Sequence, residues 1–236
     1  MCDVDKSKQN ASIWEFAGAI LFVRIFKLTR VPTPLWLCNT LLLLIQMRRS
    51  RKSNPIFVLL FSNFLNVFGW ALLTPLYALY ATELGASPQV VTFSWSFYTL
   101  LAGVLMIALG WLEDRLPKKG RLLIGGYIIQ TLGVSVLFFA PDVRWLMVGL
   151  GIYAIGTGIV MPIWKLLYAR KEHRGKEATE WGIFHGVNTL LISAAAAVSG
   201  VVLTAFGFKG ILGLMVVAHA LAALVSVGTK TSLRLN

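Results

Sequence analysis

Acidic side chains, which most enzymes and metal sites require, are scarce in this sequence and lie outside its six long apolar runs. The ten are Asp3, Asp5, Glu15, Glu83, Glu113, Asp114, Asp142, Glu172, Glu177 and Glu180. The HExxH, GxSxG and P-loop motifs are absent as well. Cys2 and Cys38 have no metal-site spacing and form no disulfide framework. We therefore expect no enzyme activity, no cofactor and no metal.

Polar and aromatic side chains do recur inside the apolar runs at helical spacing. Asn63, Asn66, Trp70, Thr74 and Tyr77 follow one another every three or four residues, so on a helix they form one stripe. An asparagine that faces lipid is unfavourable, so we expect this stripe to face protein or a water-filled cavity.

Two later runs carry similar sets. One has Tyr153, Thr157, Trp164 and Tyr168 on a shared face, and the other has His185, Asn188 and Ser193. For a single residue, hydrogen bonding between helices, worth about 0.6–2 kcal/mol, explains the pattern as well as ligand contact does. For the stripes together we favour a substrate cavity.

Three ionisable side chains inside the runs have different expected roles. Lys165 lies about one turn from Arg170, so we expect it to snorkel to the cytoplasmic surface. His219 has no carboxylate placed to partner it, which favours a neutral packing histidine over a proton relay. His185 is the better candidate for proton coupling.

The elements that position these residues are predicted to be membrane-spanning helices. The chain has 236 residues, of which 57% are hydrophobic and 14% charged, and its mean hydropathy of +0.73 excludes an ordinary soluble domain. Each run can cross a hydrocarbon core of about 30 Å. The expected spans are 55–80, 90–112, 122–140, 145–168, 181–206 and 210–228, and we predict an all-α membrane protein.

The net charge of +12 comes from basic clusters between the runs, which favours membrane topology over nucleic-acid binding. The loops on one side carry fourteen basic residues and those on the other carry two, Arg144 and Lys209. The fourteen are Arg48, Arg49, Arg51, Lys52, Arg115, Lys118, Lys119, Arg121, Arg170, Lys171, Arg174, Lys176, Lys230 and Arg234. By the positive-inside rule both ends of the six-helix unit are cytoplasmic, and we expect a multi-pass protein of the plasma membrane.

The six-helix domain is expected to cover residues 55–228, followed by a cytoplasmic tail over 229–236. Residues 1–54 form an N-terminal extension whose apolar stretches are too short or too interrupted by Arg24 and Lys27 to span. Two interpretations of it stay open: Met47 is the true start of the protein, or the extension is an interfacial arm.

The loop between the second and third predicted spans carries the most specific motif. Gly110, Leu112, Asp114, Arg115, Lys118 and Lys119 match the G-x-L-x-D-R-x-G-R-K pattern, while Pro117 stands where the pattern has glycine. This loop resembles that of the major facilitator superfamily, which joins helices two and three of a six-helix repeat. The resemblance implies a gating role for Gly110, Asp114, Arg115, Lys118 and Lys119, with the aspartate locking the cytoplasmic gate.

The fifth predicted span adds to the resemblance. The segment 176–182, followed by an Ala- and Gly-rich stretch that ends at Gly207 and Phe208, is similar to the fifth helix of small six-helix members of that superfamily. The superfamily's antiporter signature, a Gly-Pro pair followed by glycines, is missing from 181–206, which weakens a drug/proton antiport function.

The first and fourth spans share a Gly–Pro spacing. Gly69 precedes Pro75 as Gly156 precedes Pro162, with five residues between in both cases. Six-helix halves of such transporters are expected to contain two three-helix units of inverted topology, so the prolines fall near opposite faces. Because proline removes a backbone hydrogen bond, these four residues are hinge candidates.

The chain is thus expected to resemble one half of a major facilitator transporter, built from two inverted three-helix repeats. We expect it to move a small organic solute by alternating access, as a homodimer or with a second six-helix half. The alternative is a non-transporting scaffold, or the partner-dependent half of a split transporter. The candidate cavity residues are Asn63, Asn66, Thr74, Tyr77, Tyr153, Thr157, Trp164, His185 and Asn188.

Overall fold

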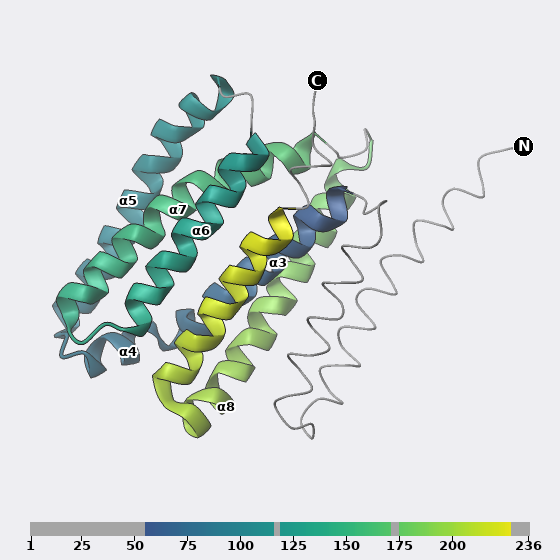
Figure 1. The fold of residues 1–236 in the computed structure, drawn as a ribbon. Helices are drawn as coiled ribbons and strands as arrows, with labels where there is room; N and C mark the ends of the chain where they lie inside the picture. Colours follow the sequence, from purple (N-terminus) through teal and green to yellow (C-terminus); the bar gives the residue numbers. More distant parts are fainter. Residues whose placement is uncertain (1–54, 116–118, 171–174, 228–236) are drawn as a thin grey trace, which may run out of the picture. The chain divides into compact units, whose positions relative to one another are not determined.

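The computed structural model describes residues 55–115, 119–170 and 175–227 of the chain. The expectations for the extension 1–54 and for the tail 229–236 fall outside these residues. All regular elements of the described part are helices, which confirms the all-α prediction (Figure 1). They are α3 Pro55–Leu73, the 3-10 turn η2 Thr74–Leu76, α4 Tyr77–Glu83, α5 Pro88–Arg115, α6 Lys119–Phe138, α7 Val143–Ala169 and α8 Glu177–Ser226.

Five helical stretches of the described residues are long and apolar enough to cross a membrane. The first is α3, η2 and α4 taken together, and the next three are α5, α6 and α7. These four match the first four predicted spans within a few residues.

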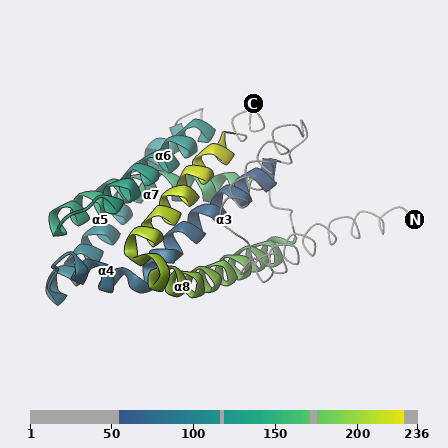
Figure 2. The ribbon, with the colours of Figure 1, turned by 60° about the horizontal axis from the view of Figure 1, so that its bottom comes forward.

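The fifth stretch, α8, covers both remaining predicted spans. It has 50 residues, about 75 Å at 1.5 Å per residue, which is more than twice the core of a bilayer. Gly207 breaks its helical backbone with φ 64° and ψ −167°, a conformation that essentially only glycine adopts. Figure 2 shows the chain turning back within α8, between its green N-terminal arm and its yellow C-terminal arm. The break lies between Phe206 and Gly210, where the predicted spans end and begin.

The first predicted span is not one continuous helix. The α-helix ends at Leu73, and Pro75 lies in the 3-10 turn η2 before α4 resumes at Tyr77. Proline has no N–H to donate and its ring crowds the preceding turn, so an α-helix is interrupted there. Pro162, in contrast, lies inside α7, which continues to Ala169.

Several helices pack against helices that are not their neighbours in the sequence. α3 packs mainly against α8, while α7 packs against α5 and α6, and α6 also contacts α8. Glycine allows the closest of these contacts: a Cβ added to Gly133 of α6 would lie 2.7 Å from the backbone nitrogen of Tyr153 in α7. The absence of a side chain at Gly133 therefore allows α7 to approach α6 this closely.

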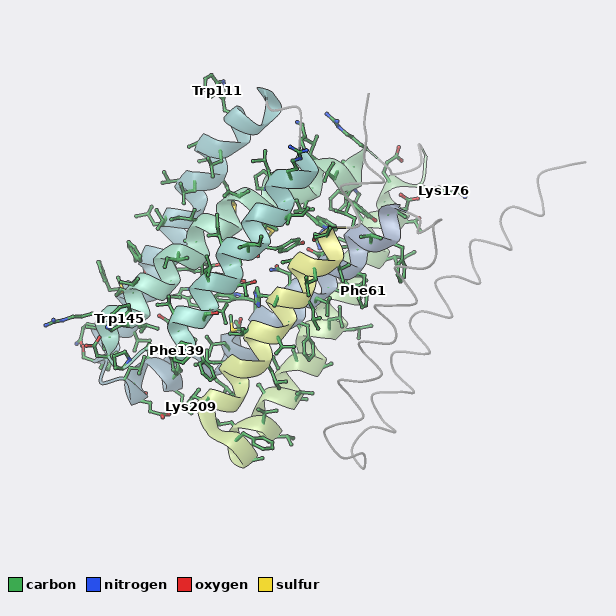
Figure 3. The ribbon with its side chains drawn as sticks, in the orientation of Figure 1. Phe61, Trp111, Phe139, Trp145, Lys176 and Lys209 are labelled. Atoms are coloured by element: carbon green, nitrogen blue, oxygen red, sulfur yellow. The ribbon has the colours of Figure 1, made fainter. Side chains whose placement is uncertain are left out.

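The surface of the bundle is apolar, as lipid contact requires. Leu100, Ile107 and Leu190 are 70–80% exposed. Figure 3 shows Trp111 at one end of the bundle and Trp145 at the other. Aromatic side chains at both ends are typical of the two interfaces of a membrane.

Candidate functional site

A chain of polar side chains joins three helices inside the bundle. Asn66 of α3 donates from Nδ2 to Oε1 of Gln130 in α6 over 2.6 Å. Gln130 in turn donates from Nε2 to the Thr157 hydroxyl of α7 over 3.1 Å, and that hydroxyl donates to the Tyr153 carbonyl. Gln130 and Thr157 are buried. Gln130 thus links the polar stripe of α3, which contains Asn66, to that of α7, which contains Thr157.

Tyr153 and His219 form a second buried polar contact, between α7 and the C-terminal arm of α8. The tyrosine hydroxyl lies 3.1 Å from Nε2 of the histidine, whose Nδ1 lies 2.7 Å from the Met215 carbonyl oxygen. A carbonyl only accepts, so Nδ1 carries the hydrogen and Nε2 accepts from the hydroxyl. With both ring nitrogens bonded and 0% exposure, His219 has the geometry of a neutral packing residue.

Four other candidates are also held by hydrogen bonds inside the bundle. Asn63 donates to the side chain of Asn188 over 3.3 Å, which joins α3 to the N-terminal arm of α8. Trp164 donates from Nε1 to the Leu59 carbonyl over 3.1 Å. The Tyr77 hydroxyl shares a hydrogen bond with that of Ser94 in α5.

An aromatic cluster lies beside these contacts. The ring of Trp70 stacks on that of Tyr153 with centroids 4.4 Å apart, and it also lies 5.1 Å from Tyr98 and 6.0 Å from Trp95. The rings come from α3, α5 and α7. Trp70 and Trp95 are half-buried, so part of each indole stays accessible.

Two candidate residues are exposed instead of buried. The Thr74 hydroxyl, at the start of η2, donates to the Trp70 carbonyl in the last turn of α3. The His185 imidazole stacks on the indole of Trp181 with centroids 5.7 Å apart. Lys165, expected to snorkel, is exposed on α7.

The residues of the predicted gating loop lie around the α5–α6 connection. Gly110 is in α5, Asp114 and Arg115 are its last two residues, and Lys119 begins α6. Lys118 and the side chains of Asp114 and Arg115 fall outside what the structure describes. The locking role of Asp114 therefore stays a prediction.

The hinge candidates differ in their surroundings. A Cβ on Gly69 would lie 2.7 Å from two ring atoms of His219, and one on Gly156 would lie 2.6 Å from Cγ of Gln130. Pro75 is exposed in η2, whereas Pro162 is half-buried in α7. Each glycine thus accommodates a polar side chain from another helix.

Gln130 was missing from the residues that the sequence analysis selected. It lies in the middle of the apolar run 122–140, so the rule that identified the asparagines would also have found it. The partner of His219 was missed for another reason, because it is a tyrosine on a different span and not a carboxylate.

Two shallow cavities lie apart from these residues. One, of about 200 Å³, is lined by Ser135, Phe138, Phe139, Gly213 and Val216. The other, of about 330 Å³, is lined mainly by apolar side chains of α6 and α8. Neither includes a candidate residue, and both have the composition of a lipid-facing groove.

Apolar spans, buried interhelical hydrogen bonds and an apolar outer surface define a multi-pass α-helical membrane protein. Residues 59–232 match the family model of the Major Facilitator Superfamily. The match covers more than half of the chain, so the chain belongs to this superfamily, as the resemblance of its loop implied. The family consists of transporters and not of enzymes, which confirms the expectation of no enzyme activity.

Each relative matches only part of this chain, and this chain matches only part of each relative. The uncharacterized MFS-type transporter YhcA of Bacillus subtilis (strain 168) is 28% identical over 142 residues, which are 58% of this chain and 26% of that protein. The peptide transporter POT in complex with sulfate has a TM-score of 0.67 at 23% identity, over 75% of this chain and 38% of that one.

A third relative gives the same picture. The POT family transporter PepTSo has a TM-score of 0.63 at 15% identity, over 75% of this chain and 37% of that one. At these identities the two solved structures establish the fold alone. The chain spans well under half the length of each of the three relatives.

Proposed function

We propose that the chain is a membrane transporter of the major facilitator type that moves a small organic solute by alternating access. The observation that carries the proposal is the family match over residues 59–232 together with the shared helical fold. Alternating access needs two units that rock around a central site. The peptides and the sulfate in the description of one solved relative belong to that protein and do not define the solute here.

The six spans of the proposal arise if α8 crosses the membrane twice, with Gly207 at the turn. Two inverted three-helix units then follow: α3 to α6, and α7 with the two arms of α8. The packing supports this division, since α3 of the first unit packs on the second unit and α7 packs on the first. The equal Gly–Pro spacing in α3 and α7 supports it as well.

The solute pathway in this proposal runs along α3 and α7. The candidates that are already hydrogen-bonded inside the bundle, such as Asn63, Thr157 and Trp164, would shape its wall. The half-buried indoles of Trp70 and Trp95 and the exposed side chains of Thr74 and His185 are the groups left available for a solute. Bending near Pro75 and Pro162 would open opposite faces, and the loop around Asp114 would close the cytoplasmic one.

Two exposed stripes of small residues suggest where a second copy would bind. In α5 the stripe consists of the exposed Thr92, Ser96 and Thr99 and the half-buried Gly103, and in the N-terminal arm of α8 it consists of Gly182, Gly186, Thr189, Ser193, Ala197, Gly200 and Thr204. Added Cβ atoms on their glycines would meet nothing within 4 Å. Small side chains at this spacing are typical of transmembrane helix interfaces, and lipid-facing positions on the same helices are bulky.

A homodimer would bring these two stripes together. α5 packs beside α7 and α8 beside α3, so the stripes flank the pair of inner helices on opposite sides (Figure 2). Two copies with the same orientation in the membrane are related by a two-fold axis along its normal. That rotation exchanges the flanks, so α5 of one copy would contact α8 of its partner.

Disulfide crosslinking between differently tagged copies tests this arrangement. With Cys2 and Cys38 replaced by serine, Ser96→Cys in one copy and Ala197→Cys in the other should crosslink, because they lie at about 12 and 13.5 Å from the outer ends of their helices. Phe93→Cys with Val201→Cys, a bulky exposed pair of matched depth, should not. A strictly monomeric protein in lipid would exclude the dimeric mechanism.

Transport itself is tested by uptake into proteoliposomes that hold the crosslinkable pair. A panel of labelled amino acids, short peptides and sugars should include at least one solute that enters protein-containing vesicles and not empty ones. Locking the two copies with the disulfide should abolish that uptake, and reduction should restore it. If the protein crosslinks only to a different six-helix chain in its native membrane, the partner-dependent half is the correct interpretation.

The proposed location is the plasma membrane, with both ends of the six-helix unit cytoplasmic. The basic clusters at Arg121 and Lys176 support the orientation. For residues 1–54, a start at Met47 and an interfacial arm both remain proposals, which the intact mass of the natively expressed protein distinguishes.

A further inference from the structure

Gln130 of α6 and His219 of α8 each fill a notch made by a glycine on an inner helix. Gln130 packs against Gly156 of α7, where an added Cβ would lie 2.6 Å from its Cγ. His219 packs against Gly69 of α3, where an added Cβ would lie 2.7 Å from its Cε1 and Nδ1. Both side chains are almost wholly buried, at 2% and 0% exposure.

We call α3 and α7 the inner helices. Each of these two side chains packs against the glycine of one inner helix and hydrogen-bonds a residue of the other. Gln130 sits in the notch of α7 and accepts from Asn66 of α3 over 2.6 Å. His219 sits in the notch of α3 and shares a 3.1 Å hydrogen bond with Tyr153 of α7. Asn66 lies three residues before Gly69, and Tyr153 lies three residues before Gly156.

The two sets of contacts therefore have the same arrangement. In one set α6 packs on α7 and bonds α3; in the other the C-terminal arm of α8 packs on α3 and bonds α7. A polar side chain facing a glycine six residues before a proline occurs in both sets. Chance similarity in one residue would not reproduce the notch, the hydrogen bond and their spacing together.

We propose that Gln130 and His219 are a symmetry-related pair of positioning residues that couple bending at Pro75, between α3 and α4, to bending at Pro162 in α7. The inference rests on the proposed alternating access and identifies the side chains that link its two hinges. A glycine has no Cβ, so the inner helix can turn against the seated side chain. The hydrogen bond on the far side then ties that motion to the other inner helix. Neither α3 nor α7 can tilt alone without breaking one of these two hydrogen bonds.

Cysteine labelling measures the coupling without any transport assay. Thr74→Cys and Met161→Cys place single thiols directly before Pro75 and Pro162, at two exposed positions, in a background lacking Cys2 and Cys38. The full-length protein in proteoliposomes is reacted with a maleimide. Introducing Pro75→Ala should change the labelling rate at position 161 about threefold or more, as well as the rate at position 74.

Removing the hydrogen bonds to Gln130 and His219 should abolish only the effect of Pro75→Ala on labelling at position 161. In the double variant Asn66→Leu with Tyr153→Phe, Pro75→Ala should still change labelling at position 74 but no longer at position 161. Asn63→Leu is the matched control, because it breaks a hydrogen bond from α3 to Asn188, in the N-terminal arm of α8, that involves neither Gln130 nor His219. The proposal is overturned if Pro75→Ala leaves position 161 unchanged when the hydrogen bonds to Gln130 and His219 are intact, or changes it equally when they are broken.

A stability test separates the two notches. Gly69→Ala should lower the thermal midpoint, and adding His219→Ala should restore part of it, because only side chains obstruct that Cβ. Gly156→Ala should not be rescued by Gln130→Ala, since its Cβ would also lie 2.7 Å from the backbone nitrogen of Gln130. Rescue at position 156 but not at 69 would contradict the proposed seating. Coupling that persists in a protein without transport would refute the proposed function alone.

Discussion

Asn66 shows how a single polar side chain is accommodated in the apolar interior. Its amide donates to Gln130, which in turn donates to Thr157, so a residue unfavourable in lipid is stabilised by partners on two other helices. Asn63 and Tyr153 each hydrogen-bond a side chain of α8 in the same way. At this scale the polar stripes are first of all links between helices.

Asn66→Leu should therefore lower the stability of the bundle by about 0.6–2 kcal/mol, the usual range for an interhelical hydrogen bond in a membrane. Leucine keeps the volume but leaves Oε1 of Gln130 without this donor. The measurement is the thermal midpoint of the purified protein in detergent. Thr131→Val is the control, since that hydroxyl bonds a carbonyl of its own helix and its loss should cost less. Equal losses would contradict the interhelical role.

At the scale of the element, glycine positions decide how closely helices approach. Gly133→Ala should destabilise the protein by about 1–3 kcal/mol, because the new methyl group would lie 2.7 Å from the Tyr153 backbone and α7 would have to move. Gly125→Ala in the same helix meets nothing within 4 Å and should be neutral or slightly stabilising. Urea or thermal unfolding of the two variants distinguishes packing from helix propensity.

The turn in α8 depends on Gly207 for a different reason. Its φ of 64° with ψ of −167° strains any residue with a Cβ, so Gly207→Ala should cost about 1–3 kcal/mol although no atom obstructs the methyl group. Gly200→Ala lies in regular helix with equal free space and serves as the control. If the two variants unfold at the same temperature, the turn does not require the glycine conformation.

At the scale of the whole molecule, the charge distribution predicts the orientation in the membrane. A single cysteine at Ser87, in the α4–α5 connection, should react with a membrane-impermeant maleimide in intact cells. A single cysteine at Lys176, before α8, should react only after the membrane is permeabilised. Both positions are exposed in the structure, so accessibility alone does not separate them. The reverse labelling pattern would refute the positive-inside assignment.

The sequence by itself determined the class of protein and the positions of most of its spans. Apolar runs and basic loops are local properties of the chain, and a bilayer reads them directly as spans and orientation. For that reason α5, α6 and α7 were predicted within a few residues, and the loop around Asp114 resembled the right family. The interruption of the first span at Pro75 was missed as a change of helix type, though its cause is visible in the sequence.

Only the tertiary structure decided which polar side chains of different helices contact one another. Nothing local in the sequence indicates that Asn66 lies against Gln130, or that the partner of His219 is Tyr153, because those contacts depend on how helices far apart in the sequence pack together. Periodicity places residues on one face of a helix but does not say what that face contacts. The apolar runs were readable one at a time, whereas the polar contacts between them exist only once the glycine notches have brought the helices together.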